Sequence, residues 1–181
     1  MLVGKQVADL ITTTRALLAF GLAWLGITIG ESSLPTAVWL LILNWVGDAL
    51  DGTLARRSSR KYHTWIGDHD LEVDILVSLG LLLYMLGAGF IDFLHLGLYG
   101  LICVLIFWHW GFHRPLGMVI QAPIYGWFIW VSLQRVPWVG IWLVIWILVA
   151  VILTWPRFLN EVVPGFLTGM KEVVNLRRKN Q

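Results

Sequence analysis

Six long apolar segments constrain this chain more than any other feature of its sequence. Each is long enough, or nearly so, to cross a hydrocarbon core, which takes about 20 helical residues. Hydrophobic residues make up 58% of the 181 residues and charged residues only 13%, about half the charged share of a soluble domain. The segments cover residues 16–30, 34–54, 71–91, 93–110, 116–133 and 136–155. The sequence therefore predicts an all-α integral membrane bundle of six transmembrane helices, forming a single domain over residues 1–181.

The N-terminal stretch has a different character. Residues 1–15 are too polar to span a membrane, and their apolar residues recur at helical spacing. This pattern predicts a juxtamembrane helix that lies along the membrane surface. The first apolar segment is short unless its helix begins near Leu10. We expect no cleavable signal peptide, because Lys5 and Asp9 fall within the first ten residues.

Prolines mark the expected starts and breaks of helices. Pro35 and Pro137 stand at segment starts, where a missing backbone N–H costs least. Pro123 is expected to interrupt the fifth segment. The link from the third segment to the fourth is expected to be tight around Asp92. Pro164 is expected to break the tail, residues 157–181, whose basic end predicts contact with anionic lipid headgroups on the cytoplasmic side.

The basic residues set the expected orientation. An arrangement with both termini cytoplasmic leaves only Arg135 on the outer face, so the positive-inside rule favours it strongly. A cytoplasmic-membrane protein of this kind has no expected nucleic-acid partner. The single cysteine, Cys103, excludes a disulfide framework and a thiolate metal site. The inner face then collects Lys5, Arg15, Arg56, Arg57, Arg60, Lys61, Arg114, Arg157, Lys171, Arg177, Arg178 and Lys179.

Four aspartates lie inside or beside two of the apolar segments. Asp48 and Asp51 are spaced i,i+3 near the cytoplasmic end of the second segment, and Asp70 and Asp74 are spaced i,i+4 at the start of the third. Each pair shares a helix face, and a helical hairpin would bring the two pairs to similar depth. Ionisable groups at membrane depth are costly and rarely face lipid. The four aspartates are therefore the candidate functional site.

Clustered carboxylates repel one another, and a divalent cation removes that conflict. Oxygen ligands without cysteine favour Mg²⁺, Mn²⁺ or Ca²⁺ over zinc. The alternative is a structural role, since a lone aspartate in a membrane helix can hydrogen-bond a neighbouring helix. Four aspartates at these spacings favour the metal site.

The aspartates and their neighbours also resemble the signature of the CDP-alcohol phosphatidyltransferases, which reads D-x2-D-G-x2-A-R followed by G-x3-D-x3-D. The family glycine is expected at position 66, where this chain has Ile66, with Gly67 one place later. A register shifted to Asp68 and Glu72 would break the spacing from Arg56, so Asp70 and Asp74 are preferred. The matching residues are Asp48, Asp51, Gly52, Ala55, Arg56, Asp70 and Asp74.

The resemblance implies an enzyme of phospholipid biosynthesis that transfers a phosphatidyl group from CDP-diacylglycerol to an alcohol and releases CMP. It implies two divalent ions, Mg²⁺ or Mn²⁺, and Asp74 as the general base. A homodimer in the membrane is expected. The implied metal ligands are Asp48, Asp51, Asp70 and Asp74, and the implied nucleotide contacts are Asp48, Gly52, Ala55 and Arg56.

Glycerol 3-phosphate is the expected acceptor alcohol. Ile75 stands where phosphatidylglycerophosphate synthases often have a lysine, so inositol phosphate, serine or a phospholipid are alternatives. A transporter or scaffold is the non-enzymatic alternative, although a transporter would be expected to show repeat symmetry. His109 and His113 are spaced i,i+4, as a pair on one helix face would be. Candidate acceptor contacts, which could equally be ordinary flanking charges and interfacial histidines, are Arg60, Lys61, His63, His109, His113 and Arg114.

Overall fold

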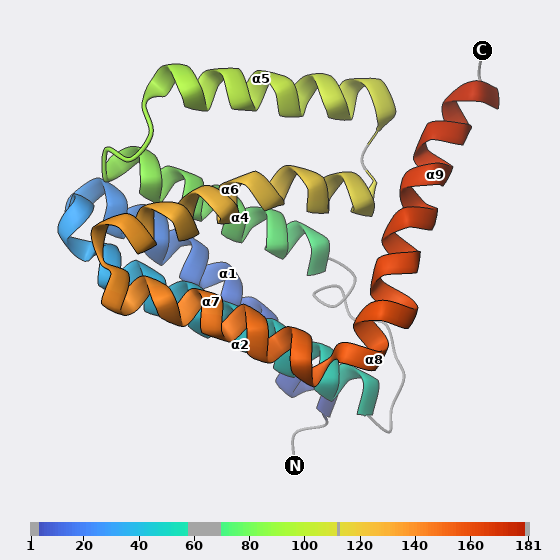
Figure 1. Cartoon of the computed structure of the whole chain (residues 1–181), viewed down its shortest axis with the longest axis horizontal. Helices are drawn as coiled ribbons and strands as arrows, with labels where there is room; N and C mark the ends of the chain where they lie inside the picture. Colours follow the sequence, from blue (N-terminus) through green and yellow to red (C-terminus); the bar gives the residue numbers. More distant parts are fainter. Residues whose placement is uncertain (1–3, 58–69, 112, 180–181) are drawn as a thin grey trace.

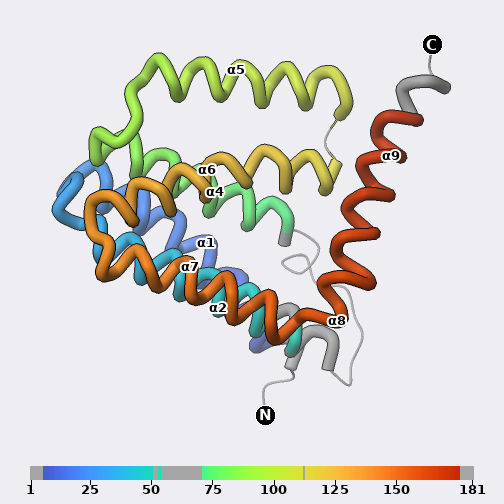
Figure 2. The backbone as a smooth tube through the Cα atoms, viewed as in Figure 1, coloured from blue at the N-terminus to red at the C-terminus, as the bar shows by residue number. Residues whose placement is uncertain are grey.

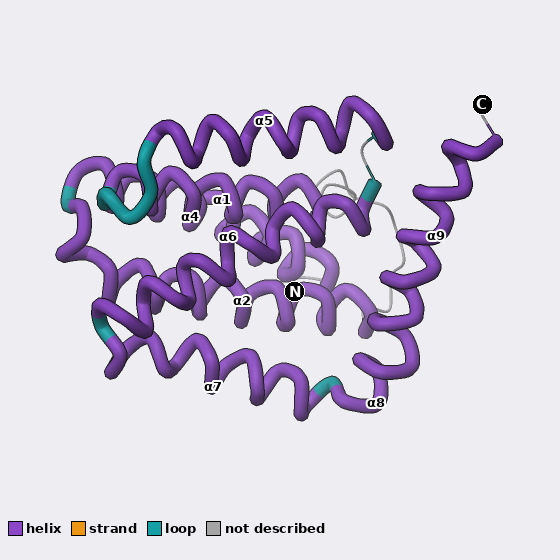
Figure 3. The backbone as a smooth tube through the Cα atoms, turned by 45° about the horizontal axis from the view of Figure 1, so that its top comes forward, coloured by secondary structure: helices purple, strands orange, loops and turns teal. Residues whose placement is uncertain are grey.

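The computed structural model describes residues 4–57, 70–111 and 113–179 (Figure 1). These ranges are helical with short turns and contain no strand, so the all-α prediction is confirmed for them. Figure 3 shows most of the helices running side by side as a bundle, with α9 (Val163–Lys179) set across one end of it.

The first helix, α1 (Gly4–Thr28), is continuous through the polar N-terminal stretch. Ala8 and Thr12 are buried, and the hydroxyl of Thr12 donates to the carbonyl of Ala8 at 3.1 Å. A separate surface helix over residues 1–15 is therefore not confirmed. The helix extends back past Leu10 because the apolar residues 16–30 alone are too few to make a helix of spanning length.

A tight turn connects α1 to α2 (Leu34–Arg57). Gly30 has a φ of 73°, a left-handed conformation that glycine adopts without steric cost. The short helix η1 (Gly30–Ser33) follows, and Ser33 Oγ donates to the carbonyl of Gly30 at 2.7 Å. Pro35 lies in the first turn of α2, as predicted. The chain thereby reverses, and α2 packs against α1.

Helix α4 (Asp70–Gly87) packs against α1 more extensively than against any other described element. Small residues allow the two backbones to touch. A Cβ added at Gly80 would lie 2.3 Å from the carbonyl oxygen of Ala19, and one added at Gly87 would lie 2.5 Å from the carbonyl carbon of Gly26. Close approach through small residues is the usual way in which membrane helices associate. The contact fixes how α1 and α4 are aligned along their length.

The next two helices are α5 (Phe93–Trp110) and α6 (Arg114–Arg135). Asp92 caps α5, accepting a hydrogen bond from the backbone N–H of His95 at 2.8 Å, which explains the tight link predicted there. Figure 1 shows α5 standing apart from the other helices, and it has no buried residue. Pro123 lies inside α6 without interrupting it, so the predicted break is wrong. Tyr99 of α5 donates to the carbonyl of Ile120, which ties α5 to α6 near the proline. The carbonyl that loses its helical partner at Pro123 is that of Val119.

The chain ends in a bent pair of helical segments. Helix α7 (Pro137–Leu153) begins at its proline, as predicted, and packs against α6 and α2. It is followed by α8 (Trp155–Arg157) and the π-helical turn η2 (Phe158–Val162). Between α7 and the segment Trp155–Asn175 the axis bends by 78°. The tube in Figure 2 follows this change of direction into α9. The π-helical turn stands just before Pro164, whose missing N–H rules out an ordinary helical hydrogen bond at that place.

One core unites five of these helices. Its centre contains one fully buried side chain from each, which is packing of the kind that holds membrane bundles together in the absence of water. These side chains are Leu22 of α1, Leu41 of α2, Leu81 of α4, Phe128 of α6 and Leu143 of α7.

The described residues contain four helices long and apolar enough to cross a membrane, or five if the bent pair counts as one span. These helices are typical of a membrane protein, but the predicted number of six spans is not confirmed. Helix α4 is not one of the four. It has 18 residues, and Asp70, Glu72 and Asp74 fall within its first five.

Candidate functional site

Arg15 of α1 is the centre of the candidate site. Its side chain is only 2% exposed, which is unusual for arginine. Gly47 of α2 makes room for it, because a Cβ added there would meet Arg15 Cγ at 3.2 Å. Long side chains on a helix point back toward its N-terminus. Arg15 therefore lies one turn below the Ala19–Gly80 contact, at the level where α2 ends and α4 begins.

Two of the four predicted aspartates contact this arginine. Arg15 Nη2 lies 2.9 Å from Asp48 Oδ1, and the same nitrogen donates a hydrogen bond to Asp74 Oδ1. The two carboxylate oxygens are therefore at most about 6 Å apart, since each lies within about 3 Å of one nitrogen. The side chain of Asp48 is 50% exposed and that of Asp74 is 30% exposed. The structure thus brings together an aspartate from α2 and one from α4, with an arginine between them.

The charges of Arg15, Asp48 and Asp74 do not cancel one another. Among the described contacts one guanidinium faces two carboxylates, and these three groups together carry a net negative charge that can attract a cation or a hydrogen-bond donor. Tyr125 of α6 is close enough to interact electrostatically with Asp74, Arg15 and Asp48. Its ring packs edge-on against Trp45 of α2, with centroids 5.7 Å apart. This ring contact joins α6 to α2 near the cluster.

Polar residues continue along both helices above the aspartates. Asn44 is one turn from Asp48 and 2% exposed, and its Oδ1 has no hydrogen-bond partner within the described part of the chain. Ser78 is one turn from Asp74, equally buried, and its hydroxyl donates to the carbonyl of Ile75 at 2.8 Å. Buried polar groups are costly unless they are satisfied. Within the described residues, Asn44 Oδ1 is therefore a buried acceptor without a partner, one turn of α2 from Asp48.

Several predicted site residues cannot be placed. The backbone positions of Asp51, Gly52, Ala55 and Arg56 belong to α2, and Asp70 begins α4, so both predicted spacings do fall on helices. Their side chains, however, lie outside the described residues, as do Arg60, Lys61 and His63 altogether. Their roles stay predictions.

The predicted histidine pair is not supported. His109 lies in the last turn of α5, where its ring packs edge-on against Trp110 with centroids 4.4 Å apart. Gly111 then ends the helix with a φ of 77°, and His113 has an extended backbone. The spacing i,i+4 therefore does not place the two histidines on one helix face, because they are not on one helix.

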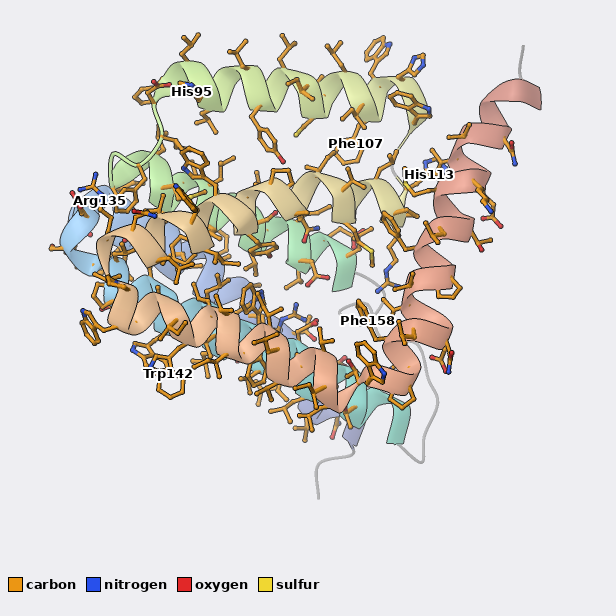
Figure 4. The ribbon with its side chains drawn as sticks, in the orientation of Figure 1. His95, Phe107, His113, Arg135, Trp142 and Phe158 are labelled. Atoms are coloured by element: carbon orange, nitrogen blue, oxygen red, sulfur yellow. The ribbon has the colours of Figure 1, made fainter. Side chains whose placement is uncertain are left out.

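Arg114, another predicted acceptor contact, lies at the start of α6 beside a cavity of about 340 Å³. The opposite wall of this cavity comes from the bent C-terminal segment. It includes Arg157, which pairs with Glu161 at 3.0 Å, and Phe166. Figure 4 shows His113 and Phe158 at this end of the bundle, while His95 and Arg135 lie at the other. Two arginines therefore face one cavity.

The carboxylates present fit a hard divalent cation in part. Within the described residues no group of three or more potential ligands comes together. Asp48 and Asp74 supply two oxygen donors of the kind that Mg²⁺ and Mn²⁺ prefer. Asp51 and Asp70 belong to the same two helices, one turn from each of them. The donor chemistry fits such an ion, and the number of ligands depends on side chains outside the described residues.

Sequence reasoning missed Arg15 as part of the site and counted it among the flanking inner charges. One signal could have found it. The first apolar segment, residues 16–30, is too short to span alone, so its helix must extend back and carry Arg15 with it. An arginine drawn into a helix of this kind needs a carboxylate partner, and the nearest carboxylates in the motif are Asp48 and Asp74.

Comparison with known protein families, curated proteins and solved structures finds no match for this chain. The function is therefore argued from the residues of the chain itself.

Proposed function

We propose that this protein is a membrane enzyme that transfers a phosphatidyl group from CDP-diacylglycerol to an alcohol, with release of CMP. The observation that supports the proposal is the meeting of Asp48 and Asp74 at one nitrogen of Arg15. These two aspartates are the first and last of the motif that resembles the CDP-alcohol phosphatidyltransferases. They stand on different helices, as that motif requires if its carboxylates act together.

The reaction needs a base, an electrophilic phosphorus and a leaving group. The acceptor hydroxyl loses its proton to Asp74, and its oxygen attacks the phosphorus that carries diacylglycerol. The bond from that phosphorus to the bridging oxygen breaks, and CMP leaves with the electron pair. Divalent ions held by Asp48, Asp51, Asp70 and Asp74 would neutralise the phosphate oxygens.

The residues of the chain have separate tasks in this scheme. Arg15 is a positioning residue, because its ion pairs hold the carboxylates of Asp48 and Asp74 toward each other. Gly52 and Ala55 leave space beside α2 for the cytidine nucleotide, and Arg56 is proposed to contact its phosphates. The net negative charge of the described cluster favours cation binding over direct binding of a phosphate.

A phosphorylated acceptor is favoured by the arginine cavity. Arg114 and Arg157 line one cavity together with Glu161, which pairs with Arg157. Arginine side chains are well suited to bind phosphate oxygens. Glycerol 3-phosphate is the proposed acceptor. Inositol phosphate carries the same phosphate, whereas serine and a phospholipid acceptor would use these arginines differently.

The membrane topology proposed for this activity has six spans and both termini cytoplasmic, in a homodimer. The distribution of Lys and Arg supports it. The candidate site would then lie at the inner surface, where acyl chains can stay in lipid while the nucleotide and the acceptor meet in the cytosol.

A direct assay tests the proposal. Purified protein is incubated with labelled CDP-diacylglycerol and Mg²⁺ or Mn²⁺, together with glycerol 3-phosphate, inositol phosphate, serine or a phospholipid in turn. Product mass identifies the acceptor. We expect CMP release and one new lipid with glycerol 3-phosphate, and none without an alcohol or with a chelator. Failure of every acceptor to release CMP would contradict the proposed function.

A further inference from the structure

A cavity of about 650 Å³ lies far from the aspartates, within the size range of small-molecule sites. It is lined by residues from the end of α4, the link to α5, the start of α5 and the middle of α6. Asp74 and Gly87, near opposite ends of α4, are about 20 Å apart at a rise of about 1.5 Å per residue. Apolar side chains make most of the cavity wall, among them Leu82, Met85, Leu96 and Ile124.

One edge of the cavity is charged. Asp92 accepts two hydrogen bonds from His95, from the backbone N–H at 2.8 Å and from Nδ1 at 2.6 Å, and both reach Oδ1. The hydrogen bond from the His95 backbone is the main reason that the pKa of Asp92 is lowered. Asp92 is 64% exposed and His95 is 74% exposed, so the carboxylate is anionic at neutral pH and accessible from the cavity edge.

Aromatic residues line the cavity between this charged edge and the apolar interior. Phe90, Tyr99 and Trp127 all contribute to the wall. The Tyr99 hydroxyl donates to the carbonyl of Ile120, and Trp127 Nε1 donates to the carbonyl of Phe90 at 3.4 Å. Their polar atoms are thus engaged by the backbone. The faces of aromatic rings attract ammonium groups electrostatically.

The cavity is also placed where a lipid can enter it. Helix α5 has no buried residue and stands apart from α4 and α6 (Figure 1). Asp92 is at the end of a candidate span, where headgroups lie, and the apolar walls continue from there toward the middle of the spans. The cavity therefore has the polarity of an amphiphile, with one charged end and an apolar length.

We propose that this cavity binds a phospholipid with a primary ammonium headgroup, of the ethanolamine type. One acyl chain lies between α5 and the pair α4 and α6, and the ammonium group pairs with Asp92. The carboxylate attracts the ammonium group of this zwitterionic headgroup and repels a headgroup with a net negative charge. The inference uses none of Arg15, Asp48 and Asp74, so it does not depend on the proposed enzymatic activity.

Native mass spectrometry of the full chain tests the headgroup preference. The purified protein is mixed with equal amounts of phosphatidylethanolamine and phosphatidylglycerol that carry identical acyl chains. We expect about fivefold greater retention of the ethanolamine lipid, the size of effect that one exposed ion pair gives. In Asp92→Asn the preference should vanish while α5 keeps its start, because asparagine caps helices as well as aspartate does. Glu31→Gln removes a carboxylate that pairs with Arg135 at 3.1 Å and does not line the cavity, so it should keep the preference.

A second pair of variants tests the cavity itself. Leu96→Trp should fill it and reduce retention of both lipids. Leu94→Trp adds the same side chain to a position of α5 that is 68% exposed and does not line the cavity, and retention should stay as in the wild type. Melting curves verify that each variant is folded. Equal retention of the two lipids by the wild type, a preference that survives Asp92→Asn, or a lipid-free dimer that covers the cavity would each overturn the proposal.

Discussion

Arg15 of α1 and Asp74 of α4 form an ion pair in which the arginine is almost fully buried. The two residues are 59 positions apart in the sequence, and the same arginine nitrogen also contacts Asp48 of α2. Three helices are thereby joined through one guanidinium group, at the place where the sequence motif puts its carboxylates. We therefore expect the Arg15 guanidinium to contribute both to the stability of the fold and to the proposed chemistry.

Removing the guanidinium should destabilise the fold. In Arg15→Ala two carboxylates lose their common partner, and loss of one member of a buried ion pair costs about 3–5 kcal/mol. Asp48 is half exposed, so we expect a loss near the lower end of that range. Thermal unfolding in detergent measures the effect. Arg135→Ala is the matched control, since Arg135 and Glu31 are both more than half exposed and such pairs contribute about 0–1 kcal/mol. Equal effects of the two substitutions would show that Arg15 has no special role.

The contact between α1 and α4 should be intolerant of even one added methyl group. In Gly80→Ala the new Cβ would lie 2.3 Å from the carbonyl oxygen of Ala19, so the helices must separate. Overpacking of this kind costs about 1–3 kcal/mol. Gly97→Ala in α5 is the control, because a Cβ there meets nothing within 4 Å, and alanine favours the helix by about 1 kcal/mol over glycine. A melting temperature that falls for Gly80→Ala and holds or rises for Gly97→Ala is the expected result. Unchanged stability in Gly80→Ala would contradict the close approach of these helices.

The cap of α5 should depend on pH. The backbone N–H of His95 lowers the pKa of Asp92 in the folded protein, so the carboxylate stabilises the fold only while it is ionised. The contribution of the ionised cap to folding stability is complete above the usual aspartate pKa of about 3.9. It is lost as the pH falls toward the lower pKa that Asp92 has in the folded protein. The melting temperature of Asp92→Ala should therefore lie below that of the wild type at pH 6, and the difference should narrow below pH 4. A difference that widens on acidification would have the wrong sign for this cap.

Much of the fold could be predicted because long apolar segments leave few choices other than helices. The turn at Asp92 and the helix starts at Pro35 and Pro137 follow from local chemistry, and the structure has them where the sequence places them. Pro123 was misjudged because a proline removes only the backbone hydrogen bond to Val119, and the turns of α6 on either side keep the helix continuous. The number of spans is still a prediction. The acidic residues at the start of α4 oppose its insertion into a membrane, so insertion depends on the residues that pair with them and not on the hydropathy of the helix alone.

The site was only partly predictable for a similar reason. Helical spacing was enough to suggest that Asp48 and Asp74 could converge. It gave no indication of Arg15, because the alignment of α1 with α4 comes from backbone contacts at Gly80 and Gly87 that only the folded chain reveals. The histidine pair failed because Gly111 ends a helix that the spacing argument assumed to continue.

Turnover by Asp74→Asn is the most direct measurement of the central claim, that the aspartates of α2 and α4 form the catalytic site. Glu72→Gln is the matched control, since Glu72 is an exposed carboxylate on the same helix, two residues away. Glu72 is also the residue that a shifted register of the motif would use. The rate of CMP release from CDP-diacylglycerol is measured for each variant and divided by the amount of folded protein, which a melting curve gives. Binding of CDP-diacylglycerol is measured separately.

We expect Asp74→Asn to lose at least about 100-fold in turnover, as removal of a general base does, with substrate binding largely retained, and Glu72→Gln to behave as the wild type does. Normal turnover in Asp74→Asn, or loss of turnover in Glu72→Gln alone, would contradict the account.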